Sequence, residues 1–136
     1  MNQSDEQAAM IDLASSLVRA AETGRGEDIA ANFDPEAVIW HNTDELTLTM
    51  AANFPPSAAF MAKVPHRRYE DLGVMPFDGG FVQQHRIVGR TDTGAAFALP
   101  ACAVMRVLNG KIVSIHEYFD SAPIARLGIA SWLPRG

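Results

Sequence analysis

Hydrophobic positions near the start of the chain recur every three or four residues, which is the spacing of one helix face. They are Ile11, Ala14, Leu17, Val18 and Ala21. Ser4 and Gln7 have the spacing of a capping box before this run, and Thr23-Gly24 ends it. A shorter run from Gly26 to Phe33 ends at Asp34-Pro35, because the residue before proline avoids helical geometry. The chain is predicted to begin with two helices.

From residue 37 onward the pattern alternates between apolar and polar positions, as in half-buried strands. Segments 38–42 and 46–49 predict a hairpin, and segments 68–75, 81–91, 95–108 and 111–120 predict four longer strands. Turn signals separate these strands, and Asn109-Gly110 is the strongest. Consecutive strands are therefore expected to pair antiparallel. The tail from Ser121 holds a short helical stretch and an apolar segment at 129–133.

Residues 50–64 return to helical spacing, but Pro55-Pro56 interrupts it. Because proline lacks the backbone N–H, we expect an irregular piece followed by a helix that begins near Ser57. A segment of this kind is suited to form a lid over a pocket.

Helices followed by a long run of strands indicate an α+β fold. We expect a curved antiparallel sheet of about six strands wrapped around the N-terminal helices, with a cone-shaped pocket inside. The 136 residues suffice for one domain, 1–136.

Composition and charge narrow the function classes. The chain is 48% hydrophobic and 20% charged, with a formal net charge of −5 and no basic cluster beyond Arg67-Arg68. This balance argues against a nucleic-acid partner. No apolar run is long enough for a membrane span, and no secretion signal is visible. Cys102 is the single cysteine, so we expect no disulfide and a cytoplasmic setting.

The alternation assigns candidate chemistry to faces of the sheet. In segment 111–120, Glu117 shares a face with Ile115 and Phe119; in segment 81–91, His85 shares one with Phe81 and Ile87. We take both faces as inward. His85 and Glu117 would then flank the central strand across Ala101 and Ala103, whose small side chains leave room for a ligand. A carboxylate and an imidazole in an apolar interior suit general acid–base chemistry. The alternative is a satisfied polar pair without function, or a bulge that turns one of them to solvent.

Four further residues complete the predicted site. Trp40 is taken as inward, which brings Asn42 into the pocket, while Tyr69 and Asp71 could add a phenol and a second carboxylate at its mouth. The apolar lining is predicted to be Trp40, Phe81, Ile87, Leu99, Ala101, Ala103, Ile115 and Phe119.

The remaining histidines and Cys102 are given no role. The alternation places His41 and His116 on the outward face of the sheet, and His66 is expected in a solvated loop. His41, His85 and Glu117 could form a metal site only if they shared a face. We expect no metal and no cofactor, and a small buried thiol at Cys102.

Two segments resemble a known family. They are Ala37-Val-Ile-Trp-His-Asn42, which follows Phe33-Asp-Pro-Glu, and the hairpin Asn109-Gly-Lys-Ile-Val-Ser-Ile-His-Glu-Tyr-Phe-Asp120. Together they resemble the SnoaL-like family of the nuclear-transport-factor-like cone superfamily. This superfamily, also called cystatin-like, includes polyketide cyclases, limonene-epoxide hydrolases and ketosteroid isomerases.

The resemblance implies site positions. In the epoxide-hydrolase pattern Trp40 takes the place of a tyrosine, Asn42 that of an asparagine, and His85 that of an arginine. Glu117 takes the place of the acid of the last strand. Ile87 stands where that pattern has a second acid, so the hydrolase set is incomplete.

The leading hypothesis is a cofactor-independent acid–base enzyme of the isomerase, cyclase or lyase type. It would act on a small hydrophobic molecule that bears a carbonyl or hydroxyl group, with Glu117 and His85 moving the proton and Asn42 or Tyr69 holding an oxyanion. The alternatives are a non-catalytic binding or dimerisation module and an epoxide-hydrolase-like hydrolase. A homodimer through the outer sheet face is also expected.

Overall fold

The computed structural model describes residues 2–135, which form helices and strands in the order that the sequence predicts. In chain order the elements are α1 (Gln3–Thr23), α2 (Gly26–Ala30), β1 (Phe33–His41), β2 (Thr47–Thr49), α3 (Met50–Lys63), β3 (Arg68–Phe77), β4 (Gly80–Arg90), β5 (Ala96–Leu108), β6 (Lys111–Phe119) and α4 (Ser121–Arg126). The α+β class is confirmed.

The six strands form one sheet in the order β2-β1-β6-β5-β4-β3. The pairs from β6 to β3 are antiparallel, as the turn signals predicted, and so is β1 with β2. β1 and β6, however, run parallel. The sheet is therefore mixed and mostly antiparallel, because the β1–β6 pair joins segments far apart in the sequence and is fixed by no turn.

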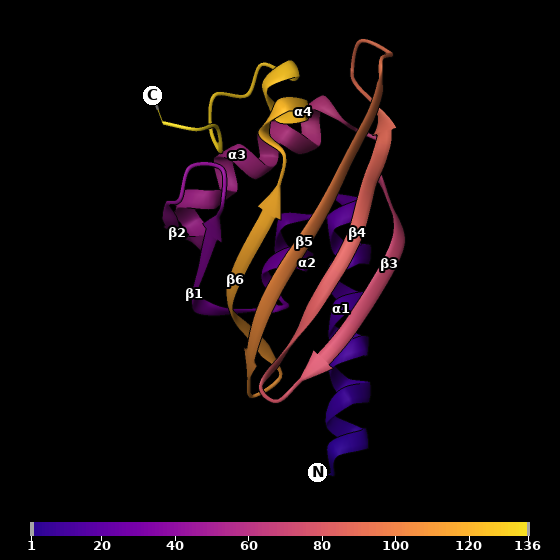
Figure 1. Ribbon diagram of the computed structural model, residues 1–136, viewed down its shortest axis with the longest axis vertical. Coiled ribbons are helices and arrows are strands. Elements are labelled where there is room, and N and C mark those ends of the chain that lie inside the picture. The colour runs from indigo at the N-terminus through magenta and orange to yellow at the C-terminus, as the bar shows by residue number, and fades with distance from the viewer. Residues whose placement is uncertain (1, 136) are drawn as a thin grey trace.

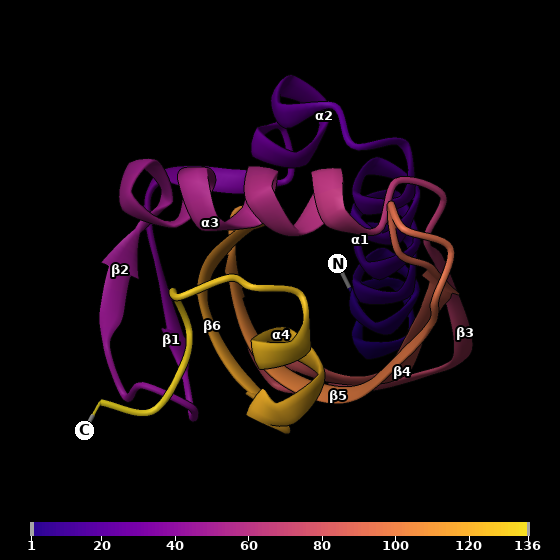
Figure 2. The same ribbon diagram turned by 90° about the horizontal axis from the view of Figure 1, so that it is seen from above.

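The sheet curves around the helices. Figure 1 looks onto its outer face, with α1 behind the strands; Figure 2 shows α3 crossing the open side of the curve and α4 near one end. Phe97, Leu99, Ala103 and Met105 of β5 are buried, while the alternate positions Ala98 and Pro100 are exposed. This confirms the inner face predicted for the central strand.

The buried side chains form two clusters. The first includes Phe33, Ile39 and Met105, and the second includes Phe60 and Trp132. Between them lies the cavity described below, because its walls take residues from both clusters.

The first two helices differ slightly from the prediction. The N-cap of α1 is Asn2, whose side chain accepts a hydrogen bond from the Asp5 amide at 2.9 Å, so Ser4 lies inside the helix. α2 ends at Ala30, and β1 already begins at Phe33. The backbone is thus already extended before Asp34-Pro35.

Helix α3 runs unbroken through Pro55 and Pro56, so the prediction of a start near Ser57 is wrong. Thr49 caps it and accepts a hydrogen bond from the Ala52 amide at 3.1 Å. The two prolines remove the donors that Ala51 and Ala52 would use. Both alanines are exposed, so water can solvate their carbonyls.

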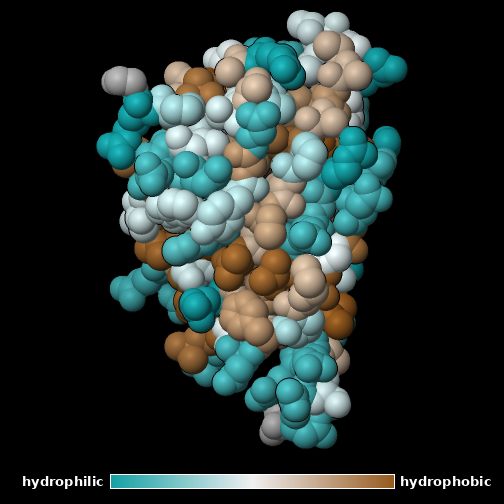
Figure 3. All heavy atoms as spheres, in the orientation of Figure 1, coloured by the Kyte–Doolittle hydropathy of each residue, from teal (hydrophilic) through white to brown (hydrophobic). Residues whose placement is uncertain are grey.

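The outer face of the sheet carries apolar side chains. Val38, Met75, Leu108 and Tyr118 are exposed there, and Figure 3 shows apolar side chains gathered between polar ones on this side. Association of two copies through this face stays a prediction. Within residues 2–135, no helix is both long and apolar enough to cross a membrane.

Candidate functional site

A histidine and a carboxylate meet on the parallel strands β1 and β6. His41 and Glu117 are direct register partners, and His41 Nε2 lies 3.2 Å from Glu117 Oε2. The His41 ring is buried, whereas the Glu117 side chain keeps 31% exposure and lines the cavity. The outward orientation expected for His41 is therefore wrong.

The environment of Glu117 favours its ionised form. Burial by itself raises the pKa of this carboxyl, but the hydrogen bond from His41 and the nearness of the His41 and His85 rings outweigh it. The pKa of Glu117 therefore lies below its usual range. At neutral pH this group is a carboxylate, which can accept a proton.

On the other side of the central strand lies a second polar group. Gln83 Nε2 lies 3.1 Å from His85 Nδ1, and the Tyr69 ring packs on the His85 ring with centroids 4.8 Å apart. Because Gln83 donates to Nδ1, the hydrogen of a neutral His85 ring lies on Nε2. The alternation places Gln83 on the inward face, but nothing in the sequence indicates its contact with His85. That contact and the burial of Gln83 are seen only in the structure.

His85 and Tyr69 are both held in their neutral forms. Burial lowers the pKa of His85 more than the nearby Glu117 raises it. Burial also raises the pKa of Tyr69, with a further contribution from the charge of Glu117. At neutral pH each side chain can therefore donate a hydrogen bond without carrying charge.

The small side chains of β5 separate these two polar groups. Ala103 pairs with both Glu117 and Gln83, while Ala101 pairs with both Phe119 and His85. No bulky side chain of β5 stands between the carboxylate and the imidazole. Both groups line the same cavity, as the alternation predicted.

The cavity has a volume of about 410 Å³ and mostly apolar walls. Five predicted lining residues contribute to it: Ile87, Leu99, Ala101, Ile115 and Phe119. Phe81 and Ala103 are fully buried in the first core cluster and lie outside the lining, which corrects their predicted role. Helices α1 and α3 provide the opposite wall, so the predicted lid segment does cover the cavity.

Trp40 faces away from the cavity, contrary to the prediction. Its ring packs on His116 and Tyr118 of the outer face, at centroid distances of 5.2 and 5.4 Å. Both parities of β1 carry large apolar side chains, so alternation alone could not choose between them. Because Trp40 and His41 are adjacent on the strand, an inward Trp40 implies an outward His41, so the two predictions fail together.

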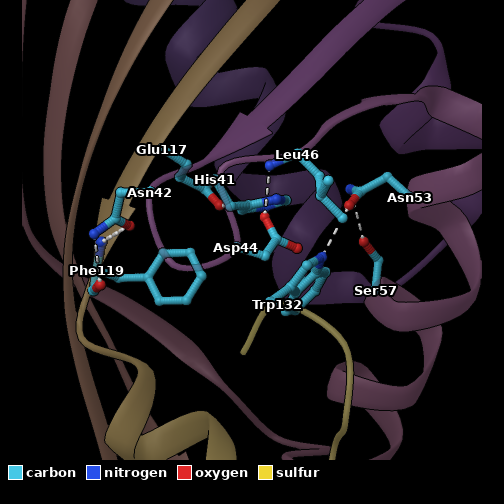
Figure 4. A network of polar contacts seen from close by, with 9 residues as sticks. All are labelled: His41, Asn42, Asp44, Leu46, Asn53, Ser57, Glu117, Phe119 and Trp132. Atoms are coloured by element: carbon cyan, nitrogen blue, oxygen red, sulfur yellow. Dashed lines mark hydrogen bonds and ion pairs between the residues drawn. The ribbon is translucent and has the colours of Figure 1, made fainter. Parts of the chain in front are cut away.

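Asn42 and Asp71 also lie outside the cavity lining. The Asn42 amide bridges the backbone of Phe119: its Oδ1 accepts from the Phe119 N–H at 2.9 Å and its Nδ2 donates to the carbonyl at 3.2 Å (Figure 4). It extends the β1–β6 ladder rather than holding an oxyanion. Asp71 lies at a register shift of β3 with a φ of 54°, and its side chain is 73% exposed beside Arg86. This shift turns the predicted second carboxylate to solvent.

The epoxide-hydrolase set, which the sequence already leaves incomplete at Ile87, also lacks its asparagine in the cavity, because Asn42 is engaged with the backbone. Within residues 2–135, no group of three or more His, Cys, Asp or Glu side chains could hold a metal ion. His66 and His116 are exposed, and Cys102 is only half-buried.

The part of the cavity wall that α3 and the C-terminal segment form has its own polar contacts, shown in Figure 4. Asn53 Nδ2 of α3 donates to Ser57 Oγ at 3.2 Å, and Asn53 Oδ1 accepts from Trp132 Nε1 at 3.1 Å. A hydrogen bond thus joins the C-terminal segment to the helix that covers the cavity.

No protein-family model and no curated protein matches this chain. Solved structures do match. AclR from Streptomyces galilaeus, assigned as a hydroxylase, has a TM-score of 0.80 at 16% identity, covering 90% of this chain and 82% of AclR. A protein from Bacillus subtilis, assigned as an isomerase, has a TM-score of 0.79 at 15% identity. The match covers 98% of this chain and 99% of that protein.

A SnoaL-like protein from Jannaschia sp. CCS1, assigned as a polyketide cyclase, has a TM-score of 0.78 at 11% identity, covering 96% of this chain and 98% of that protein. At these identities the likeness shows the fold. The chain has the nuclear-transport-factor-like, or cystatin-like, fold of the SnoaL-like proteins, as the resemblance predicted.

Proposed function

We propose that the protein is a cofactor-independent acid–base enzyme that moves a proton next to the carbonyl group of a small hydrophobic molecule. The observation that carries this proposal is the carboxylate of Glu117, which is held ionised by His41 in a cavity that also presents neutral hydrogen-bond donors. That combination of a base and neutral donors suits formation of an enolate.

Glu117 is the base in this proposal. A substrate carbonyl would lie with an adjacent C–H bond at Oε1 or Oε2 of Glu117. The proton passes to the carboxylate, the C–H electron pair forms a C=C bond, and the negative charge moves to the carbonyl oxygen. His41 reaches no substrate atom in this step; its hydrogen bond orients the carboxylate.

His85 and Tyr69 are the proposed donors to the developing oxyanion. The Nε2–H of His85 and the hydroxyl of Tyr69 are both neutral donors, and they need not lose a proton during the step. The apolar walls strengthen these hydrogen bonds because they keep water away from the charge. The Tyr69 side chain lines the cavity and packs on the His85 ring, which supports placing the two donors on the same wall.

The enolate could then take a proton at another carbon, attack a second carbonyl or expel a leaving group. These outcomes are an isomerisation, a cyclisation and an elimination. The occurrence of this fold in proteins assigned as an isomerase and a cyclase supports this range of reactions.

The base step can be tested without the natural substrate. 2-Tetralone has a C–H bond next to both a carbonyl and an aromatic ring, and its exchange for deuterium in D₂O can be followed by proton NMR. The wild-type protein should accelerate this exchange, and Glu117→Gln should lose about 10²-fold or more of the acceleration. Glu36→Gln, a change at an exposed acid of β1, is the matched control.

The outcomes separate this proposal from its alternative. Acceleration that survives Glu117→Gln in a folded protein contradicts the proposal. Binding of 2-tetralone without any exchange would instead favour a non-catalytic small-molecule-binding module.

A further inference from the structure

The C-terminal segment contributes to the wall of the cavity. Residues 127–135, called the strap here, follow α4 and pass over β6 toward the turn between β1 and β2 (Figure 2). Trp132 is the cavity-lining residue of this strap, and it is only 8% exposed. Nothing in the acid–base chemistry above uses it.

The indole of Trp132 forms a wall between the polar pair and α3. Its ring lies 5.1 Å from the His41 ring, 6.5 Å from Phe119 and 6.4 Å from Phe60 of α3, measured between centroids. Its side chain therefore touches the residue that orients Glu117 and the helix that covers the cavity.

Two hydrogen bonds hold Trp132 and the strap around it in this position. The Nε1–H donates to Asn53 Oδ1 at 3.1 Å, and further along the strap Arg135 Nε donates to the Asp44 carbonyl at 3.1 Å. The backbone of Trp132 has a φ of 64°, a conformation that costs a bulky residue free energy and persists only where tertiary contacts hold it. The strap is thus fixed by its contacts with α3 and with the β1–β2 turn.

We propose that Trp132 is the specificity-determining residue of the cavity and sets the size of the ring system that fits between the His41–Glu117 pair and α3. Shortening this side chain adds space that is continuous with the cavity, since the indole already forms part of its wall. The inference rests on the ligand-binding part of the proposed function and not on catalysis.

The sequence offers a matched control because it contains two tryptophans. Trp40 packs on the outer face and Trp132 lines the cavity. The probes are phenol, 2-naphthol and 9-phenanthrol, which have one, two and three rings and share a hydroxyl on an sp² carbon. Their dissociation constants would be measured by calorimetry for the wild-type protein, Trp132→Ala, Trp132→Phe and Trp40→Ala.

We expect Trp132→Ala to shift the preference between 9-phenanthrol and 2-naphthol at least tenfold toward the larger probe. Trp132→Phe should keep the wild-type order, since it keeps an aromatic wall, and Trp40→Ala should not change it. If Trp132→Ala fails to fold by circular dichroism, Trp132→Leu, which retains apolar packing with a smaller side chain, should give the same direction of shift.

An unchanged preference in folded Trp132→Ala or Trp132→Leu, with binding retained, overturns this inference and leaves the proposed function standing. Failure of all three probes to bind the wild-type protein and Trp40→Ala overturns both the inference and the ligand-binding part of the proposed function.

Discussion

Glu117 keeps its charge in an apolar cavity because neighbouring side chains compensate the loss of water, and His41 of the adjacent strand contributes most. The hydrogen bond from His41 is charge-assisted, and such bonds are roughly twice as strong as neutral ones. Phe119 and Trp132 pack against the His41 ring and restrict its orientation. The strength of the proposed base is thus set by a residue that touches no substrate.

At this scale, His41→Phe should raise the pKa of Glu117. The phenyl ring fills about the same space but donates no hydrogen bond, so the largest contribution that opposes the effect of burial is lost. Carbon-13 NMR titration of the glutamate carboxyls, assigned with Glu117→Gln, measures the pKa. His116→Phe, a change at the exposed histidine next to Glu117, is the control and should leave it unaltered. A pKa unaffected by His41→Phe would remove His41 from its positioning role.

At the scale of elements, the C-terminal ends of α1 and α3 converge on Arg67. This guanidinium is 5% exposed and donates to the carbonyl of Val64 at 3.3 Å, to that of Met61, and to that of Ala21. The last-turn carbonyls of a helix carry partial negative charge, which a cation stabilises. Arg67 therefore connects the covering helix α3 to α1 at the edge of the cavity.

Replacing Arg67 with Met should lower the free energy of unfolding by about 2–4 kcal/mol, because buried carbonyls lose their donors. The adjacent Arg68 offers a control, since its side chain is 67% exposed and pairs with the partly exposed Glu70. Arg68→Met should change the value by about 0.5 kcal/mol or less. Urea denaturation measures both, and equal losses in the two variants would show that Arg67 has no special role in joining the helices.

For the whole molecule, the cavity makes stability depend on pH. His85 and Glu117 both have pKa values below those of the unfolded chain. As the pH falls below about 6.5, the unfolded chain protonates His85 before the folded protein does; below about 4.3 the same holds for Glu117. Both stabilising contributions are thus present at neutral pH and are lost on acidification.

The free energy of unfolding should therefore fall between pH 7 and pH 4, by at most about 1.4 kcal/mol per pH unit for each group. His85→Gln should reduce the loss of unfolding free energy that begins below about pH 6.5. His66→Gln, a change at an exposed histidine, should leave the pH profile as in the wild type. Urea midpoints at a series of pH values provide the measurement. Identical profiles for the wild type and His85→Gln would contradict the burial of a neutral His85.

Local patterns in the sequence were enough to predict the layers of this protein and the inner faces of β4, β5 and β6. Alternation in β5 and β6 places Ile115, Glu117 and Phe119 on one face, and the turn at Asn109-Gly110 fixes the register between these strands. His85 and Glu117 could therefore be predicted to line one cavity. Short turns and local periodicity carry this information because a strand's side chains alternate with a period of two.

Only the tertiary structure decided what stands beside Glu117. No turn joins β1 to β6, and both faces of β1 carry apolar side chains, so the parallel pairing that brings His41 to Glu117 is absent from any local pattern. The strap that brings Trp132 onto His41, and the register shift that exposes Asp71, are likewise long-range or irregular features. Packing across the whole molecule selects among such arrangements, because their contacts join segments that the sequence keeps far apart.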